Sequence, residues 1–236
     1  MFETDERIRY SEVDCNGIVT LDSIVNYFQD CTMLHSETVG MGIEQIMKTG
    51  NFWFLSAWQI EILRAPVLYE KVKVWTNPYE TKGFFGNRNF QMLSESGEQL
   101  IRANSVWVHL NVETKTPTRI TDEEKAAYNS EDVKLEMEYA PRKIKLYDDM
   151  EECAVLPVRL SQIDTNHHVN NCEYIRTAME ATGFTGLPKQ LRAEYKKSAV
   201  MGDAFHVYLH KEEKLWTADL RGDEGESFAT VEFLLG

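Results

Sequence analysis

The chain repeats a short pattern of residues at a constant spacing of 150 positions. The first copy contains Arg9, Ser11, Asp14, Asn16 and Val19, and the second contains Arg159, Ser161, Asp164, Asn166 and Val169. The copies differ at one chemically important position, because Ile18 stands where the second copy has His168. Repetition at this scale predicts a duplicated fold unit. The loss of a histidine from one copy predicts one working site, in the second half.

The first half predicts one long helix followed by strands. Apolar residues at helical spacing run from about Leu21 to Val39, and Gly40 gives a stop signal. The buried face of this helix is expected to contain Leu21, Ile24, Val25, Phe28, Cys31 and either Leu34 or His35. Strands are expected at 3–10, 51–63, 70–77, 85–94 and 99–112, with turns at Ala65-Pro66, Asn77-Pro78 and 94–97.

The second half repeats this order. A helix is expected from about Cys172 to Thr182, with strands at 153–160, 190–197, 204–211, 214–221 and 226–235. The strand at 58–65 matches that at 192–198, and each is followed by a turn with an acid, Glu70 or Asp203. Residues 115–150 are charged and contain Pro117 and Pro141, so they predict a connecting segment with a short helix near 122–128.

Helix followed by antiparallel sheet is typical of the α+β class. A lone helix wrapped by four or five antiparallel strands is the hotdog arrangement, so we expect a tandem, or double, hotdog. The expected boundaries are 1–114 for the first hotdog, 115–150 for the connecting segment and 151–236 for the second hotdog.

Composition excludes some classes of function. The net charge of −13 opposes general binding to nucleic acid or anionic membranes. The four cysteines are widely scattered, so reduced thiols are expected rather than disulfides or zinc. The first residues carry no apolar signal region and no stretch approaches the length of a membrane span, which predicts a cytoplasmic protein.

The second loop contains groups suited to thioester hydrolysis. Asp164 offers a general base or a nucleophile, Asn166 offers amide donors for an oxyanion, and His168 can orient Asp164, share its proton or polarise a carbonyl. Backbone N–H groups near 170–173 are expected to be free of partners and to add positive potential. The alternative is that Asp164, Asn170 and Asn171 only cap the loop and the helix. No metal is expected. Cys172 is expected to be buried in the packing of the helix and not to act as a thiol nucleophile.

These residues resemble a known family. The run Asp164-x-Asn166-x-His168-Val-Asn170-Asn171-x-x-Tyr174, with Glu180 after it, resembles the motif of the acyl-acyl-carrier-protein thioesterases, double-hotdog enzymes of bacteria and plant plastids. Further similar blocks are Asn51-Phe-Trp53-x-Leu55, Gln59-x-Glu61-x-x-Arg64, Gly86-Asn-Arg88 and Ser105-x-Trp107-Val108-x-x-Asn111. The resemblance extends from about Arg7 to Asp203 and is that of a bacterial member.

The resemblance implies release of free fatty acid from acyl carrier protein, with Asp164, Asn166 and His168 catalytic. No cofactor is implied, because the substrate carries its own phosphopantetheine. The family commonly has Glu then Cys where this chain has Ser198 and Ala199, so the role of that glutamate is expected to fall to Ser198, Glu194, Glu180 or no residue. Asn170 and Asn171 are further possible supporting residues. In the family the first repeat lines the acyl tunnel, for which the candidates are Phe28, Trp53, Phe54 and Trp58. A basic surface for the acidic carrier protein is expected from Arg142, Lys143, Arg192, Lys196 and Lys197.

Alternative functions stay open at this point. An acyl-coenzyme A thioesterase of the same fold, a hotdog hydratase or dehydratase, and a binding-only hotdog protein all fit the pattern. Single hotdogs usually pair and the tandem can supply that pair internally, so both a monomer and a homodimer are compatible with it.

Overall fold

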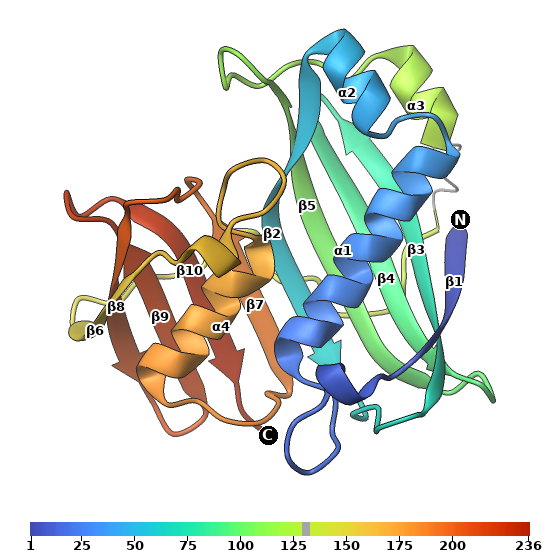
Figure 1. Ribbon diagram of the computed structural model, residues 1–236. Helices are drawn as coiled ribbons and strands as arrows, with labels where there is room; N and C mark the ends of the chain where they lie inside the picture. Colours follow the sequence, from blue (N-terminus) through green and yellow to red (C-terminus); the bar gives the residue numbers. More distant parts are fainter. Residues whose placement is uncertain (129–132) are drawn as a thin grey trace. The chain divides into compact units, whose positions relative to one another are not determined.

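Each half of the chain folds as a long helix lying across one face of an antiparallel sheet (Figure 1). The computed structural model describes residues 1–128 and 133–236. It divides into one unit of Met1–Val19 and Ser23–Ala140 and a second unit of Thr20–Asp22 and Pro141–Gly236. The predicted α+β class, with two tandem helix-on-sheet units, is confirmed.

The first unit contains the longer helix and the longer strands. Its strands follow the order β1-β3-β4-β5-β2, with antiparallel pairing throughout. The elements are β1 (Phe2–Arg7), the 3₁₀ turn η1 (Tyr10–Glu12), α1 (Leu21–Thr38), α2 (Ile43–Thr49), β2 (Asn51–Ile62), β3 (Lys71–Lys82), β4 (Phe85–Ser94), β5 (Gln99–Asn111) and α3 (Asp122–Tyr128).

The core of this unit lies between α1 and the sheet. Phe28 of α1 is fully buried, with its ring centroid 5.1 Å from that of Phe90 and 6.1 Å from that of Trp58. Further along the helix the buried side chain is His35, which is 3% exposed, whereas Leu34 is 49% exposed. The apolar stripe of α1 therefore ends in a buried histidine.

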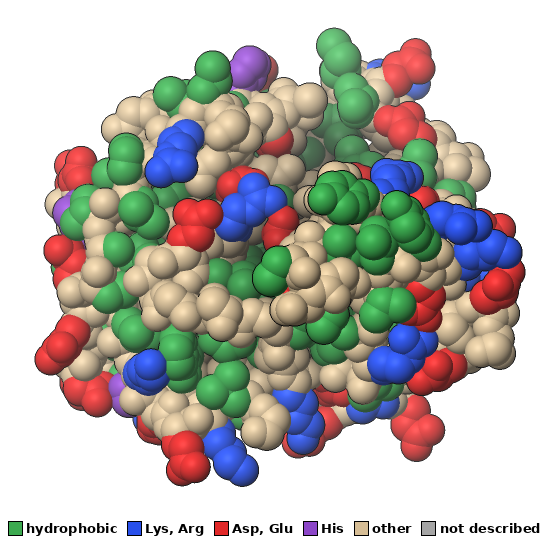
Figure 2. Space-filling model, turned by 60° about the horizontal axis from the view of Figure 1, so that its bottom comes forward, with side chains coloured by type: hydrophobic (Ala, Val, Ile, Leu, Met, Phe, Trp, Pro, Cys, Tyr) green, Lys and Arg blue, Asp and Glu red, His purple; other side chains and the backbone are tan. Residues whose placement is uncertain are grey.

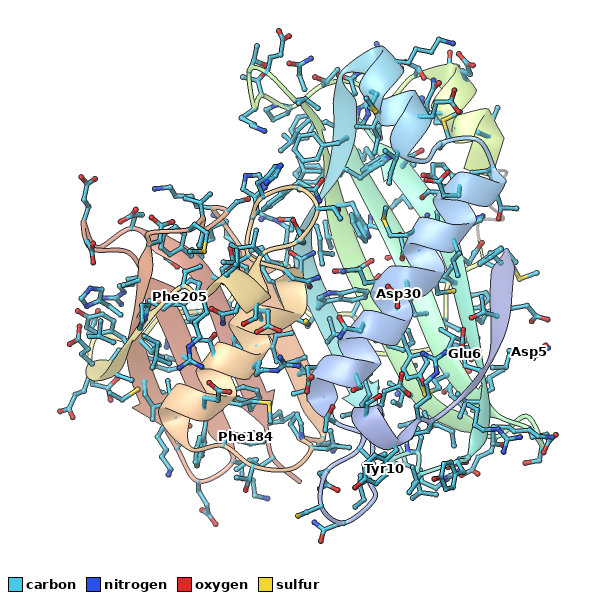
Figure 3. The ribbon with its side chains drawn as sticks, viewed as in Figure 1. Asp5, Glu6, Tyr10, Asp30, Phe184 and Phe205 are labelled. Atoms are coloured by element: carbon cyan, nitrogen blue, oxygen red, sulfur yellow. The ribbon has the colours of Figure 1, made fainter. Side chains whose placement is uncertain are left out.

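The second unit has the same plan with shorter elements. Its strand order is β7-β10-β9-β8-β6. The elements are β6 (Glu151–Pro157), the 3₁₀ turn η2 (Leu160–Gln162), α4 (Asn171–Thr182), β7 (Gln190–Tyr195), β8 (Ala204–Lys211), β9 (Leu215–Arg221) and β10 (Ser227–Leu234). Aromatic rings fill its core: Tyr174 of α4 packs edge-on against Phe205, and Phe184, just beyond α4, stacks on Phe233. Phe184 and Phe205 are labelled in Figure 3.

The expected turn at Asn77-Pro78 was wrong. Strand β3 continues through Pro78 to Lys82, and the chain turns at Gly83, where φ is +65°. The pairing of β3 with β4 shifts register between Pro78 and Glu80. A proline cannot donate to a sheet ladder and is tolerated at such a bulge, so the proline marks the irregularity and not the strand end.

The helix α2 was not predicted. Its seven residues are too few to give a readable period, and it lies between Gly42 and Gly50. Gly50 ends the helix in the left-handed region, with φ of +68°, and its N–H donates to the carbonyl of Ile46. This is the usual glycine end of a helix.

Each sheet holds its own stretch of the segment that connects the two halves. In the first unit, the Gln59 amide donates to the carbonyl of Glu138 (2.7 Å) and accepts from the N–H of Ala140 (2.8 Å). In the second unit, Arg192 donates to the carbonyls of Pro141 (2.6 Å) and Lys143 (3.0 Å). Gln59 on β2 and Arg192 on β7 occupy matching positions, so both repeats bind the connecting segment from the same strand position.

Candidate functional site

The polar loop of the second unit is a small closed hairpin between η2 and α4. One carboxylate oxygen of Asp164, Oδ1, accepts from the backbone N–H groups of Asn166 (2.7 Å) and His168 (3.4 Å). The Asp164 N–H donates to the His168 carbonyl at 2.8 Å, and Ile163 bridges to Val169. These bonds bring Asp164, Asn166 and His168 together on one loop.

The loop of the first unit has the same backbone frame. Oδ1 of Asp14 accepts from the N–H groups of Asn16 (2.9 Å) and Ile18 (3.0 Å), and Val13 bridges to Val19. These N–H donors, Ile18 foremost, hold the pKa of Asp14 below its ordinary value. Asp14 has no histidine beside it, so its role is to hold the loop backbone. Asp164 makes the same backbone contacts and therefore has this structural role as well.

The frame requires a left-handed residue between the asparagine and the residue that aligns with His168. Gly17 has φ of +75° and His167 has φ of +60°. Glycine adopts this region without cost, whereas a side chain there is strained. His167 is exposed and marks the turn.

The loops differ in what their side chains do. In the first loop the Asn16 amide donates to Oδ2 of Asp14 at 3.3 Å, so the polar groups close on one another. In the second loop, Oδ2 of Asp164, the Asn166 amide and the His168 imidazole make no hydrogen bond to any residue that the structure describes. Asn166 is exposed and the other two are half-buried, so all three groups are available to a ligand.

The start of α4 is capped by Asn170. Its side-chain oxygen accepts from the N–H of Cys172 at 3.1 Å, and its carbonyl accepts from the N–H of Glu173. The expectation that the N–H groups at 170–173 stay free was therefore wrong for Cys172 and Glu173, and the Asn170 N–H itself donates to Gln162. Asn171 is the first helical residue, and its carbonyl accepts from the Tyr195 hydroxyl.

The Ser198-Ala199 segment borders the loop. The Ala199 carbonyl accepts from the Val169 N–H at 2.9 Å, and the Ala199 N–H donates to the Tyr174 hydroxyl at 2.8 Å. Ala199 is fully buried, and Ser198 beside it is half-buried. Of the three candidates for the role of the family glutamate, Ser198 is therefore the one whose neighbour is bonded to the loop.

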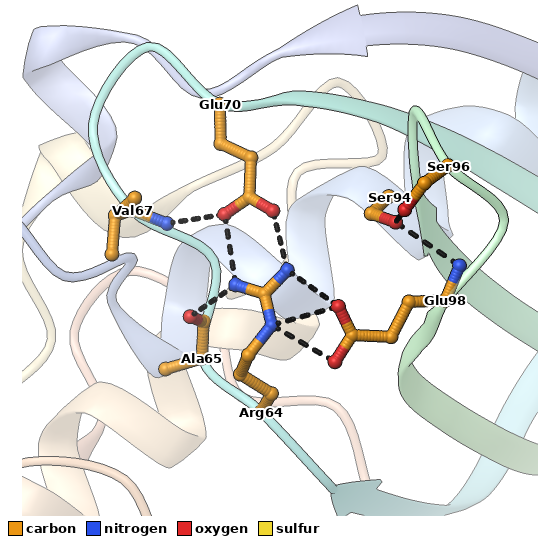
Figure 4. Close-up of polar contacts among 7 residues, drawn as sticks. All are labelled: Arg64, Ala65, Val67, Glu70, Ser94, Ser96 and Glu98. Atoms are coloured by element: carbon orange, nitrogen blue, oxygen red, sulfur yellow. Dashed lines mark hydrogen bonds and ion pairs between the residues drawn. The ribbon is translucent and has the colours of Figure 1, made fainter.

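The acids that follow both matching strands close equivalent turns. Figure 4 shows Glu70 accepting from the Val67 N–H (3.0 Å) while Arg64 forks between Glu70 and Glu98. Arg64 lowers the pKa of Glu70. In the second unit Asp203 accepts from the Val200 N–H at 2.9 Å. The two repeats thus share the acidic side chains that close these turns.

The other two candidates for the role of the family glutamate, Glu194 and Glu180, lie away from the loop. Glu194 is buried and accepts from the Ile144 N–H at 3.0 Å, with Arg142 3.6 Å away. Neighbouring strand residues point to opposite faces, so Glu194 faces away from α4, toward which Tyr195 points. Glu180 is exposed near the end of α4, about 14 Å along the helix from Asn171.

The four tunnel candidates divide into two pairs. Phe28 and Trp58 are buried in the packed core, whereas Trp53 and Phe54 are half-buried. Trp53 lines a pocket of the first unit with a volume of about 100 Å³. Its indole lies over Gly86, where an added Cβ would come within 2.9 Å of the ring. Gly86 is thus required for the close approach of Trp53 to β4.

Four of the five basic candidates are engaged within the protein. Arg192 pairs with Glu232 (2.8 Å), Arg142 with Glu194 (3.6 Å), Lys196 with Thr230 (2.7 Å) and Asp219 (3.6 Å), and Lys197 with Glu226 (2.7 Å). The Lys197 pair repeats the Arg64–Glu98 pair of the first unit. Lys143 is exposed, and its side chain pairs with nothing in the described part of the chain.

None of the four cysteines forms a disulfide, and Cys31 and Cys172 are buried. Within residues 1–128 and 133–236, no three His, Cys, Asp or Glu side chains form a group that could hold a metal ion. The helices in those residues include none long and apolar enough to span a membrane.

This fold is that of the tandem hotdog thioesterases. An acyl-ACP thioesterase structure from Bacteroides thetaiotaomicron superposes with a TM-score of 0.89 over 98% of this chain and 96% of its own, at 24% identity. The 12:0-ACP thioesterase of Umbellularia californica superposes with a TM-score of 0.82 at 20% identity, over 99% of this chain and 96% of its own.

Family models identify the relationship directly. The acyl-ACP thioesterase N-terminal domain matches residues 1–128, and the acyl-ACP thioesterase C-terminal domain matches residues 144–232. The chain therefore belongs to the acyl-ACP thioesterase family, as its motifs suggest.

Curated relatives include chloroplast enzymes. An acyl-[acyl-carrier-protein] hydrolase of Cuphea viscosissima is 27% identical over 77% of this chain and 47% of its own length. Oleoyl-acyl carrier protein thioesterase 2 of Arabidopsis thaliana is 28% identical over 74% of this chain and 52% of its own. The chain thus spans about half the length of these relatives.

Proposed function

We propose that this protein hydrolyses the thioester of an acyl group carried on acyl carrier protein and releases the free fatty acid. Family membership supports the reaction class, and the names of the curated relatives support the carrier-bound substrate. The observation that carries the proposal is the contrast between the two loops. The same backbone frame occurs in both loops. Only in the copy with His168 do the carboxylate oxygen, the amide and the imidazole make no hydrogen bond to a described residue.

Thioester hydrolysis needs a proton acceptor for water and donors for the oxyanion. In our proposal His168 or Oδ2 of Asp164 takes a proton from water, whose oxygen attacks the thioester carbon. The Asn166 amide donates to the oxygen on which negative charge develops. Collapse of the intermediate breaks the carbon–sulfur bond, and the phosphopantetheine thiol leaves with a proton. No metal or organic cofactor is needed for these steps.

The reaction is tested with carrier proteins loaded with saturated acyl chains of several lengths, with free fatty acid as the readout. We expect fatty acid to be released, with kcat/KM higher than for coenzyme A thioesters of the same chains. Hydrolysis of the coenzyme A thioesters alone would favour an acyl-coenzyme A thioesterase. Water addition to unsaturated thioesters without hydrolysis would favour a hydratase, and binding without turnover would favour a binding-only protein.

We further propose that exposed lysines of the second unit contact the acidic carrier protein. Basic side chains are interspersed with acidic ones on the face drawn in Figure 2, so a contact must depend on a few local charges. Lys143 and Lys197 are the candidates, because both are exposed. Lys196 is unsuitable for a test, since a carboxylate placed there would lie against buried Asp219.

Lys143→Glu and Lys197→Glu are each expected to raise KM for acyl carrier protein substrates roughly two- to fivefold, because a rim charge contributes modestly to association. The increase should shrink as salt is added. KM for coenzyme A thioesters should change less, and Lys73→Glu, an equal charge change on β3 of the first unit, should change neither. Equal increases for both substrates would remove these lysines from the docking surface.

A further inference from the structure

The first unit contains a buried arginine that pairs with no acid among residues 1–128 and 133–236. Arg88 of β4 is 6% exposed. Its Nη1 donates to the Thr76 hydroxyl at 3.3 Å and lies 3.0 Å from Nδ1 of His35, and the guanidinium carbon is 5.4 Å from the centroid of the Tyr128 ring. Burial lowers the pKa of Arg88 to about 10, so the side chain still carries its charge at neutral pH.

The described contacts of Arg88 are to neutral groups only. Burial and the nearby Arg88 charge lower the pKa of His35 to about 4, so the imidazole is neutral at neutral pH. Nε and Nη2 of Arg88 make no hydrogen bond to residues 1–128 or 133–236. By contrast, Arg64, Arg102, Arg192 and Arg221 each pair with a carboxylate. An unpaired buried charge is costly unless a ligand completes it.

Arg88 lines the pocket of about 100 Å³ that also borders Trp53. Residues of α1, α2 and α3 contribute to the lining of this pocket. In Figure 1 these three helices come close together near the C-terminal end of α1. Its walls are largely apolar, with Ile46, Trp107 and Ile120 among the lining residues. The hydroxyls of Ser36 and Tyr128, 3.0 Å apart, also belong to the lining. The pocket therefore combines apolar walls with the buried Arg88 cation and several hydroxyl groups. The second cation in the lining, Lys125, already pairs with Asp122 at 3.1 Å.

We propose that this pocket binds the carboxylate end of an aliphatic chain. The carboxylate accepts hydrogen bonds from Arg88 and from the Ser36 or Tyr128 hydroxyl, and the first methylene groups contact the apolar wall. Glu124, the acid in the lining, is already 3.0 Å from His109 and accepts from the hydroxyl of Thr121, so it does not neutralise Arg88. The ligand is either a free fatty acid or an acyl chain with a carboxylate at its far end.

The proposal is tested by calorimetric binding of decanoate and of decanol, which has the same chain without the charge. We expect wild-type protein to bind decanoate more tightly than decanol. Arg88→Met should weaken decanoate binding by about tenfold or more and leave decanol binding unchanged, because it removes a charged donor and keeps an apolar side chain. These measurements involve no hydrolysis, so they stand whether or not the proposed reaction is correct.

Two controls keep the test decisive. Arg7→Met removes the same charge from β1, at a position opposite Lys71 at the start of β3. Arg7 does not line the pocket, so this variant should not alter decanoate binding. Arg88→Lys keeps a charge and is measured in case the methionine variant does not fold; it should retain part of the preference for decanoate. Wild-type binding of decanol as tight as that of decanoate, or unchanged decanoate binding in a folded Arg88→Met protein, would overturn the proposal.

A second arm identifies the source of the carboxylate. Carrier proteins loaded with a decanoyl chain or with the same chain ending in a carboxylate are compared in wild type and Arg88→Met. A preference for the carboxylate-ended chain that disappears in the variant assigns the pocket to the substrate. Decanoate binding that depends on Arg88, without such a preference, assigns it to free fatty acid.

Discussion

Replacing His168 with isoleucine is expected to lower kcat for acyl carrier protein thioesters by about 10²–10⁴-fold, the usual contribution of a group that transfers protons. The fold should be preserved, because isoleucine already occupies the aligned position, 18, of the first loop, which has the same hydrogen-bonded frame. Initial rates of fatty acid release and the Tm of both proteins measure the two effects.

Two companion variants isolate the imidazole. His167→Ala removes the neighbouring histidine, whose exposed side chain is not part of the proposed chemistry, and should keep most of the activity. Ile18→His places a histidine in the first loop, where the Asn16 amide is already bonded to Asp14, and should not restore hydrolysis to His168→Ile. Near wild-type rates in His168→Ile would refute the assignment of the site.

The sequence predicted elements better than it predicted contacts. Local pattern predicts the span of α1, the helix at Asp122–Tyr128 and the strand at Ala204–Lys211. The spacing of apolar residues along the chain differs between a helix and a strand that each bury one face. The proline at position 78 misled the assignment of a strand end, because a proline signals a turn and a bulge equally. Local signals cannot distinguish these without the partner strand.

Side-chain roles depended on tertiary neighbours that the sequence does not reveal. The spacing of α1 left Leu34 and His35 equivalent, and only the packing selects His35, which lies beside Arg88. The Glu194 carboxylate is held by the connecting segment, which is 50 residues earlier in the chain. In the sequence Arg88 stood out only as part of a family block. Its neighbours in the structure show that no described residue supplies it with a counter-ion.

The repeat itself supplies a control for the most ambiguous residue of the site. Asp164 both holds its loop and offers a free oxygen, and mutation of Asp164 alone would mix these roles. Asp14 holds a loop with the same frame and has no histidine beside it. The difference in activity between variants at the two positions therefore measures the chemical role of Asp164.

Asp14→Asn and Asp164→Asn should lower Tm by similar amounts, because each replaces a carboxylate that accepts from two backbone N–H groups. Asp164→Asn should lower kcat by about 10²-fold or more, whereas Asp14→Asn should stay within about twofold of wild type. Thermal unfolding and fatty acid release, measured on the same preparations, test both statements. Equal losses of activity would mean that Asp164 acts only through the loop.

The pH dependence of stability gives an independent check on the structural role. The folded state lowers the pKa of Asp14, so its carboxylate stabilises the fold at neutral pH and loses that contribution as the pH falls below the ordinary aspartate pKa. The Tm difference between wild type and Asp14→Asn should therefore narrow in acid. A difference that stayed constant across this range would mean that the charge of Asp14 does not hold the loop, and the comparison with Asp164 would lose its basis.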